Sequence, residues 1–250
     1  IECNRHVKFG RLLDRARALG FGFLATGHHA RVVVRPDGTR RIARAADAAK
    51  DQSYVLHMLD QDQLASLLFP IGDLTKDEVR QRAAGLDLRT ADKPDSQDVC
   101  FITREHGRED FLRRSLTLTP GRVVDGSGAE VGSVAAVELV TVGQRRGMAL
   151  AGGAAPRFAV DVDVAGATVT VGSIDDLMVD ATPLEAFSWA DGPVVGRVLV
   201  QTSAHGSCDP AVLDDGVVRW AEPRPRVALG QSVVFYDGDQ VLGGSIARQA

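Results

Sequence analysis

The chain has 250 residues, of which 44% are hydrophobic and 25% charged, proportions that are ordinary for a soluble globular protein of one large or two to three small domains. The net charge of −4 at pH 7 gives no overall attraction to nucleic acid. No apolar run approaches the roughly 20 residues that cross a bilayer, and no signal peptide is visible, so we expect no membrane partner. Three cysteines do not make a disulfide framework, which predicts a reducing, cytoplasmic setting.

The charges are distributed unevenly along the chain. Residues 1–46 hold ten Arg or Lys against three acids, whereas residues 160–250 hold thirteen acids against five arginines. A basic first part can attract phosphate even when the whole chain is acidic. The alternative is that these charges lie on solvated helix and hairpin faces.

In chain order, the first half of the sequence has an α/β pattern. The spacing of apolar residues from Phe9 to Leu19 predicts a helix that Gly20 ends. Residues 21–26 predict a short buried strand that leads into Gly27-His28-His29, and ligands bind at such strand ends in open α/β sheets. The further expected elements are a hairpin over 31–44, a helix over 60–68, a helix from a capping box at Thr75 to Leu86, a loop over 87–100 and a short helix over 108–115.

After about residue 116 the pattern becomes that of a β protein. Apolar residues alternate, and Asp-Gly turns recur at 125–126, 215–216 and 237–238. We expect domains over residues 1–115, 116–182 and 183–250, the last two being small β-domains or barrels. The expected strands cover 123–124, 139–142, 158–162, 168–171, 194–201, 217–220, 232–236 and 241–246.

Two cysteines lie in polar segments ninety-seven positions apart. Cys3 is part of Glu2-Cys3-Asn4-Arg5-His6, and Cys100 is part of Asp95-Ser96-Gln97-Asp98-Val99-Cys100. Two thiols that meet in space suggest sulfur chemistry, because a thiolate can attack and can carry a second sulfur. The alternative is that each is a small buried apolar residue. Cys208, which follows a Gly-Ser pair, is interpreted as structural.

Three polar motifs are candidate binding sites. Gly27 allows close backbone approach and His28 can donate to a phosphate or a base, although two surface histidines or metal ligands are alternatives. Lys50, Asp51 and Gln52 suit RNA or else begin a helix. The third motif places Gln144, Arg145 and Arg146 between glycines, which suits phosphate contact or an ordinary basic turn.

Together these segments resemble the tRNA-specific 2-thiouridylases, in the same order and over the whole chain. The segments that carry the resemblance are Cys3-Asn4-x-x-Val7-Lys8-Phe9, Ala25-Thr26-Gly27-His28, Lys50-Asp51-Gln52-Ser53-Tyr54, Phe69-Pro70-Ile71-Gly72, Asp95 to Ile102, Gly143-Gln144-Arg145-Arg146-Gly147 and Gly230-Gln231-x-x-Val234-Phe235-Tyr236.

The resemblance implies a fold and a reaction. The fold would be the C-terminal part of an adenine-nucleotide α-hydrolase-like (PP-loop) α/β domain, then a small β-rich central domain and a C-terminal β-barrel. The reaction would replace O2 of the wobble uridine of tRNA with sulfur, using ATP, expected with Mg²⁺, and persulfide sulfur delivered by a sulfur-relay donor or a cysteine desulfurase. The protein would be a cytoplasmic monomer.

The resemblance also implies residue roles. Cys100 would carry the persulfide and Cys3 would be its partner nucleophile, with a Cys3–Cys100 disulfide as a product or intermediate. Gly27 would lie against ATP. The residues implied in tRNA binding are His28, Lys50, Asp51, Gln52 and Gln231, and the basic turn adds Gln144, Arg145 and Arg146.

The sequence departs from the family pattern in three places. A Ser-Gly-Gly-x-Asp-Ser type pyrophosphate loop, and an acid/base aspartate expected just before Ile1, are not in these 250 residues. We therefore expect that the natural protein extends further and that this chain alone binds ATP poorly and does not turn over. Ser203-Ala204 and His29 replace residues more usual in the family. The alternative function is a non-catalytic RNA-binding fragment with structural cysteines.

Overall fold

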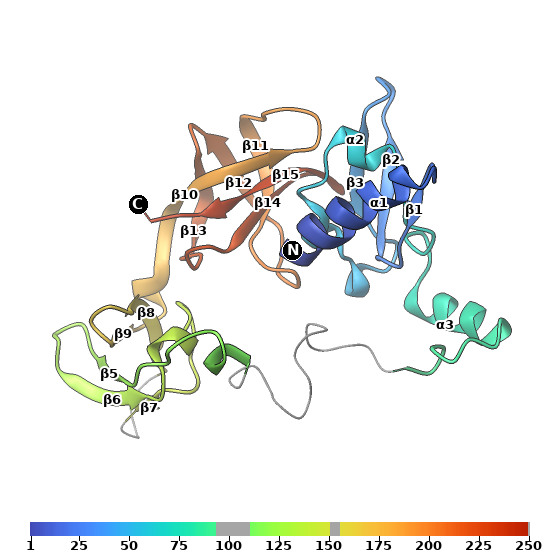
Figure 1. Cartoon of the computed structure of the whole chain (residues 1–250). Coiled ribbons are helices and arrows are strands. Elements are labelled where there is room, and N and C mark those ends of the chain that lie inside the picture. The colour runs from blue at the N-terminus through green and yellow to red at the C-terminus, as the bar shows by residue number, and fades with distance from the viewer. Residues whose placement is uncertain (94–110, 151–155, 250) are drawn as a thin grey trace. The chain divides into compact units, whose positions relative to one another are not determined.

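The structure is a computed structural model that describes residues 1–93, 111–150 and 156–249 (Figure 1). Its packing divides the chain into two compact units. The first unit holds Ile1–Lys93, Ala181–Ala221 and Leu229–Ala250, and the second holds Pro94–Asp180 and Glu222–Ala228. The N-terminal segment therefore packs in one unit with the C-terminal strands. The three-domain division at 1–115, 116–182 and 183–250 stays a prediction.

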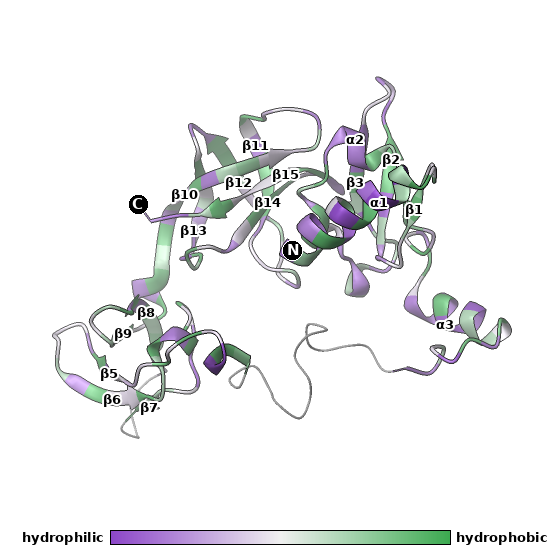
Figure 2. Ribbon diagram, viewed as in Figure 1, coloured by the Kyte–Doolittle hydropathy of each residue, from purple (hydrophilic) through white to green (hydrophobic). Residues whose placement is uncertain are grey.

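The N-terminal part of the first unit is a small α/β arrangement. A π-helix, η1 (Cys3–Leu12), continues into α1 (Leu13–Ala18). Figure 2 shows both hydrophilic and hydrophobic residues along this helix, and its buried side chains include Phe9 and Leu13. Gly20, with a φ of +82°, follows the helix as the sequence predicts. Strand β1 (Leu24–Ala25) then pairs in parallel with β4 (Leu67–Leu68).

Short helices and turns connect the remaining elements of this part. They are η2 (Ala48–Lys50), η3 (Ser53–Leu56), α2 (Gln61–Leu64) and α3 (Lys76–Gly85). The predicted capping box is present in α3, since Thr75 accepts from the amide of Glu78 and Glu78 accepts from the amide of Thr75. Helix α3 buries none of its own residues.

A closed β-barrel, two strands of which continue into residues of the second unit, forms the rest of the first unit. Its described strands are β10 (Met178–Trp189), β11 (Gly196–Gln201), β12 (Asp209–Asp214), β13 (Val217–Pro225), β14 (Ser232–Asp237) and β15 (Gln240–Ala247). Their order is β10-β13-β12-β11-β14-β15, and pairing of β10 with β15 closes the ring. The predicted hairpin, β2 (Ala30–Val34) and β3 (Arg40–Arg44), extends this sheet because Ala43 pairs with Gln240.

One hydrophobic core joins the α/β part to the outside of the barrel. Phe9, Leu13 and Leu56 come from the N-terminal elements, whereas Val234 and Tyr236 come from β14. All five are nearly or fully inaccessible to solvent. The α/β and β parts expected from the sequence are therefore both present, and they share a core.

The second unit is a β-rich fold. Its described strands are β5 (Gly121–Val124), β6 (Glu130–Val134), β7 (Ala149–Leu150), β8 (Phe158–Asp163) and β9 (Thr168–Gly172), with short helices η4 (Val137–Leu139) and η5 (Asp175–Leu177). The order is β7-β6-β5-β9-β8, with β5 parallel to β9. Val123, Val137 and Val169 are among the residues of its own core.

Two predicted elements are wrong and one is shorter than expected. The helix expected over 60–68 ends at Leu64, because Ser66 accepts from the amide of Leu24 and the chain continues as a strand beside β1. The strand expected over 139–142 is instead the end of η4 followed by a turn. The strand expected over 21–26 is limited to the two residues of β1. Of the expected helix over 108–115, residues 111–113 are helical and 108–110 lie outside the described residues.

Candidate functional site

The Gly27-His28 loop lies between β1 and β2. Gly27 is exposed, and a Cβ placed on it would have only the Cδ1 of Ile71, at 4.0 Å, within contact distance, so a ligand could approach its backbone closely. His28 is 6% exposed and its ring packs against Phe9 and Phe69, with centroids 5.5 and 5.8 Å away. The His28 ring therefore packs in the protein interior, and little of its surface is open to a ligand.

The electrostatic environment of His28 keeps its ring neutral. Burial, and next the charge of Lys8, lower the pKa of His28 to about 4. Its Nδ1 lies 2.8 Å from the hydroxyl oxygen of Thr26. At neutral pH this ring can accept or donate one hydrogen bond at each nitrogen, but it brings no positive charge to a phosphate.

The Lys50–Tyr54 segment lies directly beside this loop. The amide of Gln52 donates to the carbonyl of His29 at 2.8 Å, and the amide of His29 donates to the side-chain Oε1 of Gln52 at 2.9 Å. Asp47 caps η2 by accepting from the amide of Ala49, and Lys50 is the last residue of that helix. The Gly27-His28-His29 motif and the Lys50–Tyr54 segment, about two dozen residues apart in the sequence, thus form one surface.

Asp51 points into the protein. Its carboxylate accepts hydrogen bonds from Arg44, from the amides of Ala45 and Ser53, and from the Ser53 hydroxyl. The side chain is only 7% exposed. All of these bonds are internal.

Cys3 is exposed at the start of η1, next to the same segment. The adjacent Asn4 is buried, and its Nδ2 donates to the carbonyl of Val55 at 3.1 Å, which anchors this end of the helix on η3. Cys100 lies outside the described residues. The Cys3–Cys100 pairing therefore stays a prediction.

Gln231 also lies beside the Lys50–Tyr54 segment, although the sequence places it about 180 residues away. The Tyr54 hydroxyl donates to the carbonyl of Ser232 at 2.8 Å. Burial raises the pKa of Tyr54, while a hydrogen bond with the Gln231 side chain lowers it in part. The structure therefore connects the Gly27-His28 loop to Gln52 through His29, and it connects Gln231 to the same segment through Tyr54.

The predicted basic turn lies in the second unit. Both ends of the Gln144 amide are used internally, since its Oε1 accepts from the amide of Thr141 and its Nε2 donates to the carbonyl of Arg146. Gly143 and Gly147 adopt φ values of +88° and +81°, which explains the flanking glycines. Arg145 and Arg146 are exposed. Gln144 thus shapes the turn, and the two arginines are the residues available to a phosphate.

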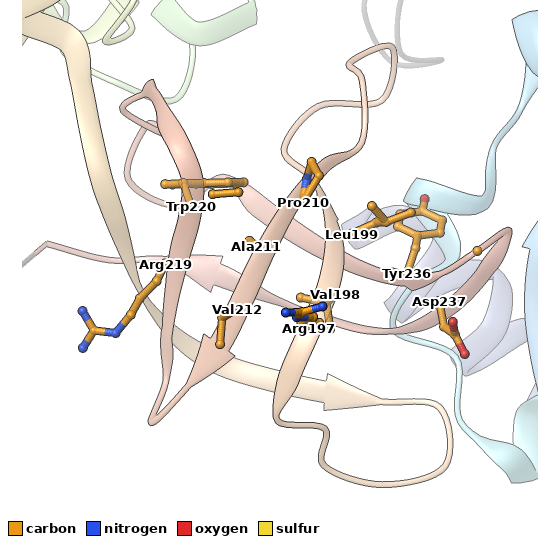
Figure 3. A pocket seen from close by; sticks show the side chains of 12 residues that line it. Arg197, Val198, Leu199, Pro210, Ala211, Val212, Arg219, Trp220, Tyr236 and Asp237 are labelled. Atoms are coloured by element: carbon orange, nitrogen blue, oxygen red, sulfur yellow. The ribbon is translucent and has the colours of Figure 1, made fainter.

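A cavity of about 670 Å³ lies over the barrel strands (Figure 3). Arg197, Leu199, Pro210, Arg219 and Tyr236 are among its lining residues. Of the predicted site residues that the structure describes, none lines this cavity. The part of the chain that the structure describes contains no cluster of three His, Cys, Asp or Glu that could hold a metal ion.

The motifs alone did not identify the residues that hold the site together. Arg44, Gln201 and Tyr236 contact one another or Asp51, yet they come from β3, β11 and β14. A buried glutamine at the end of an apolar strand is the one local signal, because buried polar side chains require partners.

Comparison with known proteins gives matches along nearly the entire chain. Family models match residues 1–104 (tRNA methyl transferase HUP domain), 109–173 (tRNA methyl transferase PRC-barrel domain) and 198–247 (Aminomethyltransferase beta-barrel domain). The tRNA-specific 2-thiouridylase MnmA of Chloroflexus aurantiacus is 44% identical over 267 residues, covering 99% of this chain and 72% of the relative. The chain belongs to the tRNA-specific 2-thiouridylase family.

Other members of the 2-thiouridylase family are equally similar. The protein of that name from Acidothermus cellulolyticus is 45% identical over 258 residues, covering 99% of this chain and 71% of the relative. The corresponding protein from Kineococcus radiotolerans is 46% identical over 259 residues, with 98% and 71% covered. These matches confirm the resemblance and, with the family models, the predicted fold class. None of the described helices is long and apolar enough to span a membrane.

Proposed function

We propose that the protein acts in tRNA 2-thiolation, the ATP-dependent transfer of persulfide sulfur to C2 of the wobble uridine to form 2-thiouridine. The observation that carries this proposal is the 44% identity to a tRNA-specific 2-thiouridylase over 99% of the chain. The exposure of Cys3 beside the Lys50–Tyr54 segment supports it, because the reaction needs a thiol next to the bound RNA. The proposed setting is the cytoplasm, and the proposed state is a monomer.

In the proposed reaction, Cys100 carries the sulfur as a persulfide that a sulfur-relay donor or a cysteine desulfurase supplies. Activation of the uridine oxygen is the chemistry that ATP supplies when bound. The terminal persulfide sulfur forms a bond to C2, and the activated oxygen leaves. The thiolate of Cys3 then attacks the Sγ of Cys100, which breaks the S–S bond to the transferred sulfur and forms a Cys3–Cys100 disulfide. A thiol reductant must reduce this disulfide before the next cycle.

The proposal assigns binding roles within a division into domains 1–115, 116–182 and 183–250. Gly27 lies open at the end of β1 and fits a close approach by the nucleotide, which Mg²⁺ is expected to accompany. His28, Lys50, Gln52 and Gln231 form the proposed RNA surface of the first unit. Arg145 and Arg146 supply phosphate contacts from the second unit, and Gln144 shapes their turn.

The test is to load sulfur and locate it. The protein, expressed from its complete gene, is incubated with a cysteine desulfurase and cysteine, and peptide masses are measured before and after reduction. We expect a reducible gain of about 32 Da on the Cys100 peptide, as a persulfide requires. Cys100→Ser should lose this gain and the thiolation of tRNA, whereas Cys208→Ser should still load sulfur on Cys100.

Cys3→Ser separates the two thiol roles. It should keep the sulfur on Cys100 but fail to complete thiolation, because no second thiolate releases the carrier. Normal thiolation by a folded Cys100→Ser protein would contradict the proposal. Retention of tRNA binding together with indifference to both cysteine substitutions would favour the RNA-binding alternative.

A further inference from the structure

Asp51 is the centre of a buried polar network that connects the Lys50–Tyr54 segment to the barrel. Arg44 Nη1 donates to Asp51 Oδ2 at 2.8 Å, and the Ser53 hydroxyl donates to the same oxygen at 2.7 Å. The amides of Ala45 and Ser53 donate to Oδ1 at 2.9 and 3.2 Å. The carboxylate therefore has two partners for each oxygen. We call Arg44, Asp51, Ser53, Gln201 and Tyr236 the anchor network.

The barrel completes this network from two strands. Arg44 Nη2 donates to Gln201 Oε1 of β11 at 2.8 Å, and its guanidinium carbon lies 4.3 Å from the ring centroid of Tyr236 of β14. The Tyr236 hydroxyl lies 3.1 Å from Ser53 Oγ. Because the Ser53 proton goes to Asp51, the Tyr236 hydroxyl is the donor in that contact. Tyr236 is fully buried, and burial raises its pKa, so the hydroxyl keeps its proton.

An acidic side chain at this position is a poor direct contact for RNA. A carboxylate repels phosphate, and Asp51 would have to give up four internal hydrogen bonds to reach a ligand. Its immediate neighbours are better suited to contact RNA, since Lys50 is cationic and Gln52 carries a donor, Nε2, besides the Oε1 that accepts from the amide of His29. The buried acid between them fixes the backbone of this segment, because its Oδ1 accepts from the amides of Ala45 and Ser53.

We propose that Gln201 and Tyr236 are positioning residues which, through Arg44 and Asp51, hold Lys50 and Gln52 in the geometry that binds tRNA. This inference rests on the proposed function and replaces direct RNA contact by Asp51 with an internal role. It predicts that removing one hydroxyl inside the fold weakens RNA binding, although that hydroxyl touches no RNA.

The test is a double-mutant cycle between Tyr236→Phe and Lys50→Ala, with the affinity for unmodified tRNA measured at several salt concentrations. Lys50→Ala should weaken binding and reduce the slope of log K against log salt by about one, as expected for a lost phosphate contact. Tyr236→Phe keeps the ring under Arg44 and should weaken binding about three- to tenfold, the effect of one hydrogen bond. In the Lys50→Ala background, Tyr236→Phe should have a smaller effect than in the unsubstituted protein, because only the contact of Gln52 is left to weaken.

Two further variants make the result specific. Ser53→Ala removes the other side of the same contact, so its effect should not add to that of Tyr236→Phe. Thr182→Val is the matched control, because it removes an equally buried barrel hydroxyl that accepts from Trp220 Nε1 at 3.0 Å, outside the anchor network. It should lower the thermal midpoint, as Tyr236→Phe does, yet leave tRNA affinity unchanged below the unfolding transition.

Additive effects of Tyr236→Phe and Lys50→Ala would overturn the proposal, and so would unchanged tRNA affinity in either single variant. Weakened binding by Thr182→Val equal to that by Tyr236→Phe would also overturn it, because the effect would then follow stability alone. In each of these cases, sulfur loading on Cys100 still tests the proposed function independently.

Discussion

His28 shows how one side chain can belong both to the core and to a proposed binding loop. Its ring contacts Phe9 and Phe69, while its backbone connects the exposed Gly27 to β2. The sequence suggested a ligand contact or a surface histidine, but a core position was not among the expectations. The reason is that the His28 ring is buried between Phe9 and Phe69, which are sixty residues apart in the sequence. No pattern of neighbouring residues predicts such a contact.

This burial predicts a pH dependence of stability. The pKa of His28 is lowered to about 4 and that of buried His57 to about 3, the latter by burial and then by the charge of Arg5. In the unfolded chain both bind a proton below about pH 6.5, so more protons are bound unfolded than folded between pH 6.5 and 4. Stability should therefore be highest above pH 6.5 and fall by about 1.4 kcal/mol per pH unit per histidine as the pH is lowered.

Urea unfolding at a series of pH values, followed by the fluorescence of Trp189 and Trp220, measures this dependence in the first unit. His28→Gln should have a shallower profile than the unsubstituted chain over this window, because one of the two contributing groups is gone. Parallel profiles for the two proteins would show that His28 is accessible to protons in the folded state.

At the level of elements, the Phe69-Pro70-Ile71-Gly72 turn is defined by close packing against β2. The Gly72 amide donates to the carbonyl of Phe69, and the Gly72 carbonyl accepts from the amide of Ala46. A Cβ on Gly72 would lie within 2 Å of the Ala30 carbonyl oxygen at the start of β2. Because both partners are backbone, neither can rotate away.

Gly72→Ala should therefore lower the stability of the first unit by at least about 2 kcal/mol, as overpacking in a core does. The matched control is Gly85→Ala at the end of α3, where an added methyl meets no atom within 4 Å and alanine favours the helix. Urea midpoints compare the two variants. Equal urea midpoints for the two variants would mean that β2 and the turn can move apart without a loss of stability.

Element prediction succeeded where a pattern is local. The hairpin of β2 and β3, the capping box of α3 and strands β8, β9, β14 and β15 were all expected near their observed positions. The helix expected through Leu68 was wrong because pairing with β1, more than forty residues earlier, outweighs helical spacing at Leu67. Strands β6 and β12 were not predicted, since each contains small or charged residues in place of an apolar run.

In the whole molecule, the N-terminal segment and the barrel depend on each other. The hairpin extends the barrel sheet, and Arg41 of β3 pairs with Asp191, which lies between β10 and β11. The Arg41 and Asp191 side chains are 8% and 14% exposed, and Arg35 donates to the same carboxylate oxygen. This ion pair is therefore shielded from water, unlike most surface pairs.

Asp191→Ala should lower the free energy of unfolding of the first unit by about 3 kcal/mol, because it leaves the Arg41 charge buried without its carboxylate. Asp62→Ala is the control. It removes a carboxylate that Arg17 also contacts at 2.7 Å but that is 78% exposed, so the loss should stay below about 1 kcal/mol. Similar losses in the two variants would contradict the difference in burial.

The sequence by itself determined the family, through the short motifs around Cys3, Gly27, Lys50 and Gln231. It also determined the α/β and β composition, because turns, helix caps and apolar alternation depend on residues that are neighbours in the sequence. Only the tertiary structure decided that Asp51 points inward and that Tyr236 lies beneath Arg44. The contact between Arg44 and Tyr236 joins residues more than 150 positions apart, as the Arg44–Gln201 hydrogen bond does. Such partners are chosen by the packing of the barrel against the α/β part, and that packing is a property of the whole chain.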